Sequence, residues 1–250
     1  MRVAAAFVAT LLAAAAAAEE VTLTATAPNG LVDQIPATVL KPDGTGPFAA
    51  VVILHDCSGL GPRSSGAPAR WAKELLGRGY AVLMADSFRT RGFPEGVCRN
   101  AAPGRTDVGP GRRAADAYAA LAYLRTLPYV DGRRIGVMGG SHGGSTTLAS
   151  IAAAERADEP MANERRHGFA AAVALYPACG ARYGTWRASP GGTAGIYTPV
   201  APLLILIGEK DDWTPADKCR DLLTRVGGGP VGLTAYPGAY HSFDAVGTKP

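Results

Sequence analysis

The sequence contains few charged side chains, and no segment concentrates charges of one sign. Charged residues are 18% of its 250 positions, and 25 Lys and Arg against 21 Asp and Glu give a formal net charge of +4. Domains that bind nucleic acids carry dense basic patches, so the sequence predicts no nucleic-acid partner. Gly and Pro (32 and 19 residues) form a smaller share than in low-complexity or disordered chains. The length therefore suits a folded protein, and one large α/β domain is the simplest arrangement.

Long apolar runs are also lacking, because a bilayer span needs about 20 residues and no segment beyond residue 18 resembles one. Before that point, Arg2 supplies a positive charge and Val3–Ala18 is apolar except for Thr10. The small residues that end this run and the abrupt change at Glu19 are typical of a secretory signal peptide. We expect residues 1–18 to be that signal peptide, residues 19–250 to form a single domain, and no membrane contact after cleavage. A membrane anchor is the alternative, which the short, Ala-rich run disfavours.

Many Ala, Gly and Arg residues with few Lys are typical of proteins from GC-rich bacteria. With the signal peptide, this composition predicts a periplasmic or secreted bacterial protein, in a compartment where disulfides persist. The four cysteines are too few for a small disulfide scaffold but leave two bridges possible. No Cys or His spacing resembles a zinc site, and we expect neither a metal nor a cofactor.

Strands and helices alternate along most of the sequence. Strands are expected over residues 21–27, 36–40, 49–54, 80–85, 134–138, 170–175, 203–207 and 233–236. Helices are expected over 69–76, 112–127 and 143–154, and a further helix starts near 214–217. This order predicts an α/β fold, a mostly parallel sheet with helices on both faces, led by an antiparallel hairpin of the first two strands.

A serine stands at the junction of one expected strand and the helix after it, in the segment Gly139-Gly140-Ser141-His142-Gly143. This G-x-S-x-G pattern, between a strand and a helix, is typical of a nucleophile elbow. The turn must be tight for the Ser141 hydroxyl to project above the sheet, which requires small residues two positions before and after. An ordinary glycine turn is the alternative interpretation.

A serine nucleophile needs a base, and the sequence offers four histidines. His241 follows the last expected strand, whereas His142 adjoins the serine and His55 more readily orders the loop after residue 54. His167 lies in a charged loop where a solvated side chain is expected. The orienting acid should follow the strand 203–207, where Asp211 and Asp212 both fit; the order Ser, Asp, His is that of α/β-hydrolases.

An oxyanion hole needs two N–H donors close to the developing negative charge. The residue after the nucleophile, His142, supplies one backbone N–H. The loop after residue 54 should supply the other, and we expect it to be that of Cys57.

Several segments together resemble the dienelactone hydrolase family of α/β-hydrolases, over about residues 30–244. The resemblance is carried by the segments 55–60, 86–91, 139–144, 208–211 and 236–243. Within the family, Ser141 resembles the nucleophile of a serine branch. The family usually ends with a helix packed on the sheet, for which the nine residues after His241 are too few, so we expect either a fold without that helix or a truncated sequence. The family places the acid three residues after the glycine that ends its strand, which implies Asp211 rather than Asp212. The family's namesake binds a substrate carboxylate with two arginines; Arg89 or Arg91 fits the first, and Ala245 stands at the second position.

The remaining residues singled out by the sequence are cysteines and aromatics. We expect the bridges Cys57–Cys98 and Cys179–Cys219, because each pair joins loops at the active-site edge; free buried thiols are the alternative. Trp213 is a candidate substrate-binding residue. Tyr183, Trp186 and Tyr197 either line the pocket with it or pack against the body of the protein.

The predicted function is that of a secreted serine hydrolase that cleaves a carboxylic ester or lactone, a small-molecule substrate, through an acyl-enzyme. Its catalytic residues would be Ser141, Asp211 and His241. A serine peptidase or amidase on the same fold is one alternative, and a catalytically silent binding protein is another. The pattern does not predict an oligomeric state.

Overall fold

A computed structural model describes residues 18–27, 29–98, 105–154, 161–189 and 192–247 of the chain. The expected signal peptide, apart from Ala18, lies outside these residues. The strands are β1 (Ala18–Thr26), β2 (Val32–Leu40), β3 (Phe48–Leu54), β4 (Ala81–Ala85), β5 (Val130–Gly140), β6 (Ala172–Leu175), β7 (Arg187–Ser189), β8 (Gly192–Ala194), β9 (Leu203–Gly208) and β10 (Val231–Tyr236). The α-helices are α1 (Ala67–Gly77), α2 (Pro110–Thr126), α3 (His142–Ile151), α4 (Ala162–Arg166) and α5 (Ala216–Leu223).

Eight of the strands form one sheet in the order β1-β2-β4-β3-β5-β6-β9-β10. β1 and β2 form an antiparallel hairpin, and β2 pairs antiparallel with β4. The other neighbours in this sheet pair in parallel. The predicted α/β-hydrolase fold with its leading hairpin is therefore confirmed. Parallel strands bring their carboxyl ends to one edge, where ligand sites form in such sheets.

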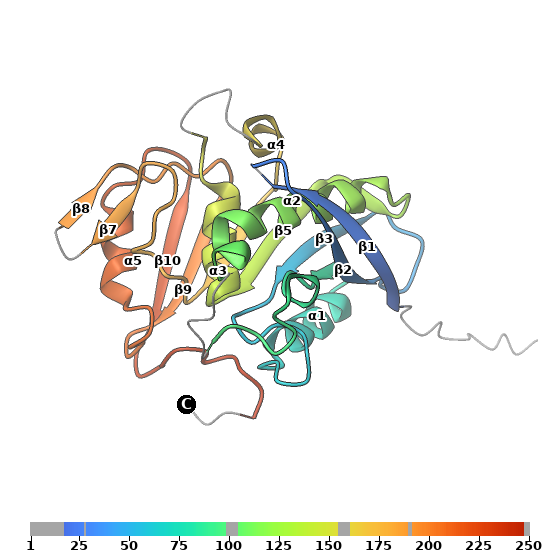
Figure 1. Ribbon diagram of the computed structural model, residues 1–250, viewed down its shortest axis with the longest axis horizontal. Coiled ribbons are helices and arrows are strands. Elements are labelled where there is room, and N and C mark those ends of the chain that lie inside the picture. The colour runs from blue at the N-terminus through green and yellow to red at the C-terminus, as the bar shows by residue number, and fades with distance from the viewer. Residues whose placement is uncertain (1–17, 28, 99–104, 155–160, 190–191, 248–250) are drawn as a thin grey trace, which may run out of the picture.

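Helices cover the two faces of the sheet unequally. Figure 1 shows α2 and α3 side by side across one face, where Val52, Val137 and Ala174 are fully buried. Side chains one position along these strands point to the opposite face. There, Val51, Met138 and Val173 line an open, mostly apolar groove of about 500 Å³, together with Leu75 of α1.

Some elements carry no periodicity in the sequence. The hairpin of β7 and β8 and the short helix α4 lie in segments for which the sequence analysis predicts neither a strand nor a helix. After β10, the described chain to Gly247 forms turns and no helix. Among the described residues, no helix is both long and apolar enough to cross a membrane.

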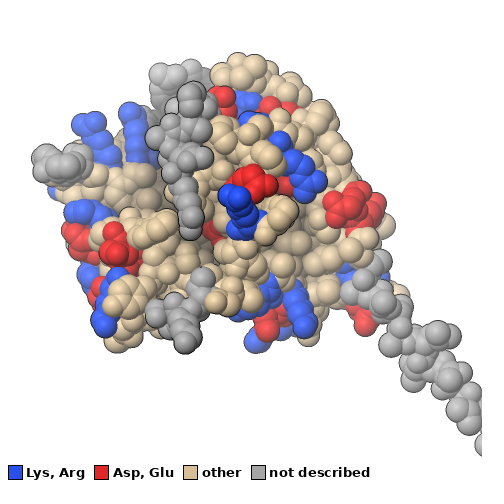
Figure 2. Space-filling view, turned by 60° about the horizontal axis from the view of Figure 1, so that its bottom comes forward, with Lys and Arg blue, Asp and Glu red and all other residues tan. Residues whose placement is uncertain are grey.

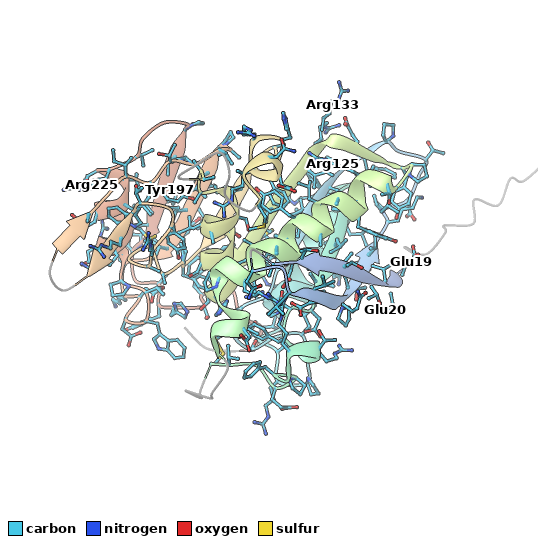
Figure 3. All side chains as sticks on the ribbon, turned by 45° about the horizontal axis from the view of Figure 1, so that its top comes forward. Glu19, Glu20, Arg125, Arg133, Tyr197 and Arg225 are labelled. Carbon is cyan, nitrogen blue, oxygen red and sulfur yellow. A yellow bond between two sulfur atoms is a disulfide. The ribbon has the colours of Figure 1, made fainter. Side chains whose placement is uncertain are left out.

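The surface carries charges of both signs. Figure 2 shows Lys and Arg side chains interspersed with Asp and Glu side chains over one face of the molecule. Glu19 and Glu20 lie at the start of β1 (Figure 3), where the Glu20 carboxylate accepts a hydrogen bond of 2.7 Å from Thr38 of β2. The segment directly after the expected cleavage position is thus part of the sheet.

Candidate active site

Ser141 lies in the turn between β5 and α3, with φ 52° and ψ −115°. A positive φ is unfavourable for a residue with a side chain, and strain of this kind is typical of a nucleophile elbow. The turn brings backbones very close together. A Cβ atom on Gly143 would lie 1.9 Å from the Leu54 carbonyl oxygen, and one on Gly139 would lie 2.6 Å from the same oxygen. Glycine is therefore required at both positions, because α3 starts directly against the end of β3.

The structure brings Ser141, His241 and Asp211 together from three separate strand ends. The Ser141 Oγ lies 2.9 Å from Nε2 of His241, and the Nδ1 of that ring lies 2.8 Å from Oδ2 of Asp211. A base within hydrogen-bond reach can remove the serine proton, and an acid on the other ring nitrogen fixes the tautomer. This geometry is suited to nucleophilic attack by the serine oxygen on a carbonyl carbon.

Asp211 is held in place by the first turn of the segment that leads into α5. Its Oδ1 accepts hydrogen bonds from the backbone N–H of Trp213 (3.0 Å) and of Thr214 (2.8 Å). Burial acts to raise the pKa of Asp211, but hydrogen bonds from His241 and Thr214 outweigh it, and the pKa lies below its ordinary value. The carboxylate is therefore ionised at neutral pH, as a partner of an imidazolium should be. The neighbouring Asp212 is exposed, and the ion pair of the His241 ring is with Asp211.

Thr214 is a member of the site that sequence analysis missed. Its hydroxyl lies 2.9 Å from Oδ2 of Asp211, 3.1 Å from Nδ1 of His241 and 3.0 Å from the Tyr176 carbonyl oxygen. A signal was present in the sequence, because an Asp in a turn commonly accepts hydrogen bonds from backbone N–H groups a few residues further along the chain, which here include Thr214.

Aromatic rings enclose the imidazole of His241. The Trp213 indole is stacked on it, with centroids 5.2 Å apart and planes 17° from parallel, and Tyr176 approaches edge-on at 4.8 Å. The loop that carries His241 is fastened by the buried carboxylate of Asp244, which accepts hydrogen bonds from Trp71 Nε1 (2.6 Å) and the Tyr176 hydroxyl. The base is thus fixed from both sides.

The loop after β3 faces the serine and is held by Asp56. The Asp56 carboxylate accepts hydrogen bonds from the N–H and hydroxyl of Ser58 and from the hydroxyl of Ser65. Among the described residues, no acceptor pairs with the Cys57 N–H, which leaves it available to a ligand. The structure joins Cys57 to Cys98, so a covalent bond also links this loop to the one after β4.

A pocket of about 320 Å³ opens beside the three residues, and its surface is mostly apolar. It is lined by Asp56, Cys57, Ser58, Ser65, Cys98, Ser141, Asp212, Trp213, Tyr240, His241 and Ser242. Trp213 therefore lies where the sequence analysis expects it.

Neither candidate arginine lines this pocket, which corrects the expectation that one of them binds substrate there. Arg91 is almost fully buried, and its guanidinium forms ion pairs with Asp116 (2.7 Å) and Asp33 (2.5 Å). Arg89 forms an ion pair with Asp86 (3.0 Å) and lines a separate surface pocket. Both side chains are used in ordering the loop after β4.

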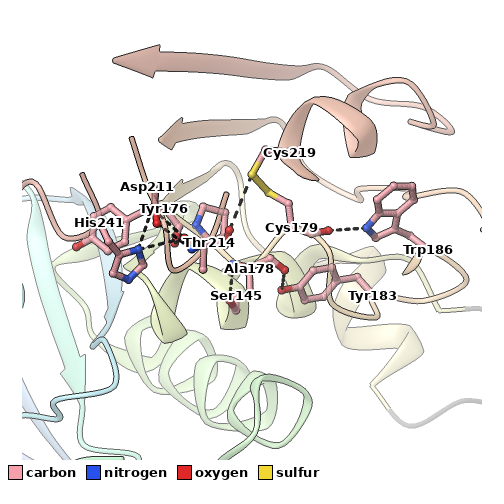
Figure 4. Close-up of a disulfide and its surroundings, with 11 residues drawn as sticks. Ser145, Tyr176, Ala178, Cys179, Tyr183, Trp186, Asp211, Thr214, Cys219 and His241 are labelled. Atoms are coloured by element: carbon pink, nitrogen blue, oxygen red, sulfur yellow. Dashed lines mark hydrogen bonds and ion pairs between the residues drawn. A yellow bond between two sulfur atoms is a disulfide. The ribbon is translucent and has the colours of Figure 1, made fainter. Parts of the chain in front are cut away.

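The other predicted aromatics pack in the core and do not reach the pocket. Trp186 donates a hydrogen bond to the Cys179 carbonyl (2.7 Å), and Tyr183 donates one to the Ala178 carbonyl (3.0 Å) (Figure 4). Tyr197 is fully buried. Of the two alternatives for Tyr183, Trp186 and Tyr197, packing against the body of the protein is therefore the one observed. Cys179 forms its disulfide with Cys219 of α5, the second pairing that sequence analysis expects, and this bond lies near the acid loop.

Comparisons with known proteins agree with this fold. The model of a family described as "Dienelactone hydrolase family" matches residues 35–249. A structure described as a "Putative Dienelactone Hydrolase" from Klebsiella pneumoniae is 19% identical, with a TM-score of 0.64 over 91% of this chain and 88% of that one. Esterase 2 of Thermogutta terrifontis, phosphonylated by cyclosarin, is 20% identical, with a TM-score of 0.62 over 92% of this chain and 87% of that one. No curated protein matches the chain.

Proposed function

The chain belongs to the dienelactone hydrolase family, whose members hydrolyse ester bonds, and on this premise we propose that Ser141 cleaves a carboxylic ester or lactone through an acyl-enzyme. The observation that best supports this proposal is the continuous chain of contacts from Ser141 Oγ through the His241 ring to Asp211, at 2.9 and 2.8 Å. Interactions of this kind activate a serine hydroxyl that is otherwise a weak nucleophile.

The proposed reaction has two halves. Ser141 Oγ attacks the carbonyl carbon while His241 Nε2 takes the hydroxyl proton, and the carbonyl oxygen becomes an oxyanion held by the N–H groups of Cys57 and His142. Collapse of this intermediate breaks the bond to the leaving oxygen, which receives the proton from His241. Water then attacks the acyl-enzyme, with His241 again taking a proton, and releases the acid and free Ser141.

Asp211 stabilises the imidazolium that forms in each half. Its lowered pKa supports this role, because a carboxylate that is ionised at neutral pH can stabilise the positive ring. Trp213 offers the substrate an apolar wall next to the reacting atoms, since its indole is stacked on the base and is 64% exposed.

The proposal includes export from the cytoplasm. The support is the apolar segment 3–18 after Arg2, together with two disulfides among the described residues. Disulfides form and persist mainly in oxidising compartments such as the periplasm. N-terminal sequencing of protein from a bacterial expression host tests this part, with Glu19 expected as the first residue.

The experiment that tests the activity compares a p-nitrophenyl ester with the matching p-nitroanilide. We expect turnover of the ester and at least about a hundredfold lower kcat/KM for the anilide. Faster cleavage of the anilide would favour a peptidase or amidase, and no turnover of any ester or lactone would favour a binding protein.

A further inference from the structure

A fully buried arginine lies behind the proposed oxyanion hole, and the catalytic triad does not use it. Arg113 of α2 donates a hydrogen bond from Nη1 to the ring Nδ1 of His142 (2.7 Å) and from Nη2 to the carbonyl oxygen of His55 (2.8 Å). Its guanidinium also lies over the Phe88 ring, 4.9 Å from the centroid. One buried cation therefore contacts both the residue next to the nucleophile and the loop that follows β3.

His55 is the second buried group near this loop. The Ser87 N–H donates a hydrogen bond to its Nε2 (3.2 Å), so the ring proton is on Nδ1, which donates to the carbonyl oxygen of Asp56 (2.7 Å). Burial, followed by the charge of Arg113, holds the pKa of His55 well below its ordinary value. The ring is therefore neutral at neutral pH and keeps one fixed tautomer.

The hydrogen bond from His55 has a direct effect on the next N–H group. In a trans peptide the C=O and N–H point in opposite directions, and the bond between Asp56 and Cys57 is trans. Fixing the Asp56 carbonyl against the His55 ring therefore aims the Cys57 N–H to the other side of the peptide. Cys57 and Ser141 both line the pocket.

We propose that His55 and Arg113 are positioning residues that set the two N–H donors of the oxyanion hole. His55 orients the peptide that carries the Cys57 N–H. Arg113 fixes the His55 carbonyl and the His142 ring, and so couples the loop after β3 to the nucleophile elbow. This inference depends on the proposed function, since it assigns a role only if an oxyanion forms at this site.

The partners of Arg113 distinguish this role from a purely structural one. Arg91, which is also buried, is bound by the carboxylates of Asp116 and Asp33, the usual way of retaining a buried cation. The hydrogen bonds of Arg113 go instead to a backbone carbonyl and a neutral ring, both at the site. Burial lowers the pKa of Arg113 to about 10, although the charges of Asp116, Asp56 and Asp86 act to raise it, so keeping this cation buried has an electrostatic cost.

Two substitutions at His55 separate its hydrogen bonds. The side-chain amide of His55→Asn can place an N–H where Nδ1 donates to Asp56, whereas His55→Gln reaches the position of Nε2 and can only replace the acceptor for Ser87. Loss of an oxyanion-hole donor slows turnover by roughly 10²–10³, and a misdirected donor should cost part of that. We expect His55→Gln to lower kcat at least about tenfold with KM little changed, and His55→Asn to recover most of kcat.

The affinity for a ketone inhibitor is a second measurement, which a change in the stability of the fold alone does not alter. A trifluoromethyl ketone forms a tetrahedral adduct with Ser141 whose oxyanion occupies the hole, so its affinity should fall in His55→Gln and in Arg113→Met by about the same factor as kcat. The acid side of the pH profile of kcat/KM should stay unchanged, because the His241 and Asp211 contacts remain.

The outcomes are distinguishable. If the wild-type protein hydrolyses no ester and forms no ketone adduct, the proposed function fails. If the wild-type protein is active but His55→Gln keeps its full kcat and ketone affinity, the positioning role is refuted. Equal losses in His55→Gln and His55→Asn that follow only the melting temperature would also refute it and leave His55 a structural residue.

Discussion

Oδ2 of Asp211 lies 2.8 Å from Nδ1 of His241, and the same oxygen accepts a hydrogen bond from the Thr214 hydroxyl. The acid thus contacts the base with one oxygen, while its other oxygen accepts the N–H groups of Trp213 and Thr214. One carboxylate therefore orders its own turn and orients the imidazole of His241.

Replacing this carboxylate gives a matched pair of variants. Asp211→Asn should lower kcat about 10⁴-fold, because the amide favours the wrong tautomer of His241 and cannot stabilise its charged form. Asp212→Asn should change kcat by less than about tenfold, since the ion pair of the His241 ring is with Asp211. Steady-state kinetics on one activated ester checks both, and a larger loss in Asp212→Asn would reverse the assignment.

The stacked pair of Trp213 and His241 leads to a second prediction. The indole face stabilises a positive charge on the imidazole by about 0.5–1 kcal/mol at an exposed site, so Trp213→Leu should lower kcat about two- to fivefold. Trp213→Phe keeps an aromatic face and should lose less. If both variants lose kcat equally, the cation–π interaction is not the cause of the loss. Trp213 would then contribute only through the apolar surface that it offers to the substrate.

Asp33 contributes a stability that depends on pH. Burial acts to raise its pKa, but hydrogen bonds and ion pairs with Arg91 and Arg112 outweigh it, and the pKa lies below its ordinary value. The folded state then favours the carboxylate, so the stabilisation is full above the unfolded pKa of about 3.9 and is lost as pH falls through the folded value.

Asp33→Asn should therefore lower the free energy of unfolding by about 1–3 kcal/mol at pH 7, as expected for hydrogen bonds to a charged group. The difference from wild type should shrink below pH 4. Urea unfolding at several pH values measures it, with the exposed Asp43→Asn as the control. A difference that is constant down to pH 2 would contradict the ion-pair explanation.

The disulfide between Cys179 and Cys219 closes a loop with a sequence separation of 40. Cross-links over loops of this length typically stabilise a fold by about 2–4 kcal/mol, chiefly through the unfolded chain. The double variant Cys179→Ser, Cys219→Ser should therefore unfold at lower urea concentration. Mass spectrometry of the non-reduced wild-type protein should find both bridges in the pairing described, and free thiols at these positions would contradict it.

The parts of the site that depend on short segments of the sequence could be predicted from it. The glycines around Ser141 and the place of His241 after the last strand follow from backbone crowding and from chain order. Between Asp211 and Asp212 the residues alone left the choice open, because neighbouring carboxylates in one loop look alike until the turn is folded. The structure shows Asp211 turned toward the base by the N–H groups that follow it.

Contacts between side chains that are distant in the chain could not be predicted from the sequence. The family resemblance suggested Arg91 as a substrate-binding residue. Its ion pairs with Asp33 and Asp116 could not be predicted, because these partners lie far away in the chain and meet Arg91 only in the folded protein. His55 and Arg113 were missed as a pair for the same reason, since 58 positions separate them. The segment around the hairpin of β7 and β8 has no alternating pattern in the sequence, so the aromatics that flank the hairpin, Tyr183, Trp186 and Tyr197, fitted a place in the pocket as well as one in the core.

The central claim is that Ser141 is the nucleophile, and labelling with a fluorophosphonate probe tests it most directly. We predict one stoichiometric adduct, located at Ser141 by peptide mass spectrometry. Ser141→Ala should abolish the adduct together with ester hydrolysis, and Ser145→Ala, in the helix that follows Ser141, should keep both. Folded wild-type protein that takes no label, or a label that persists in Ser141→Ala, would contradict the account.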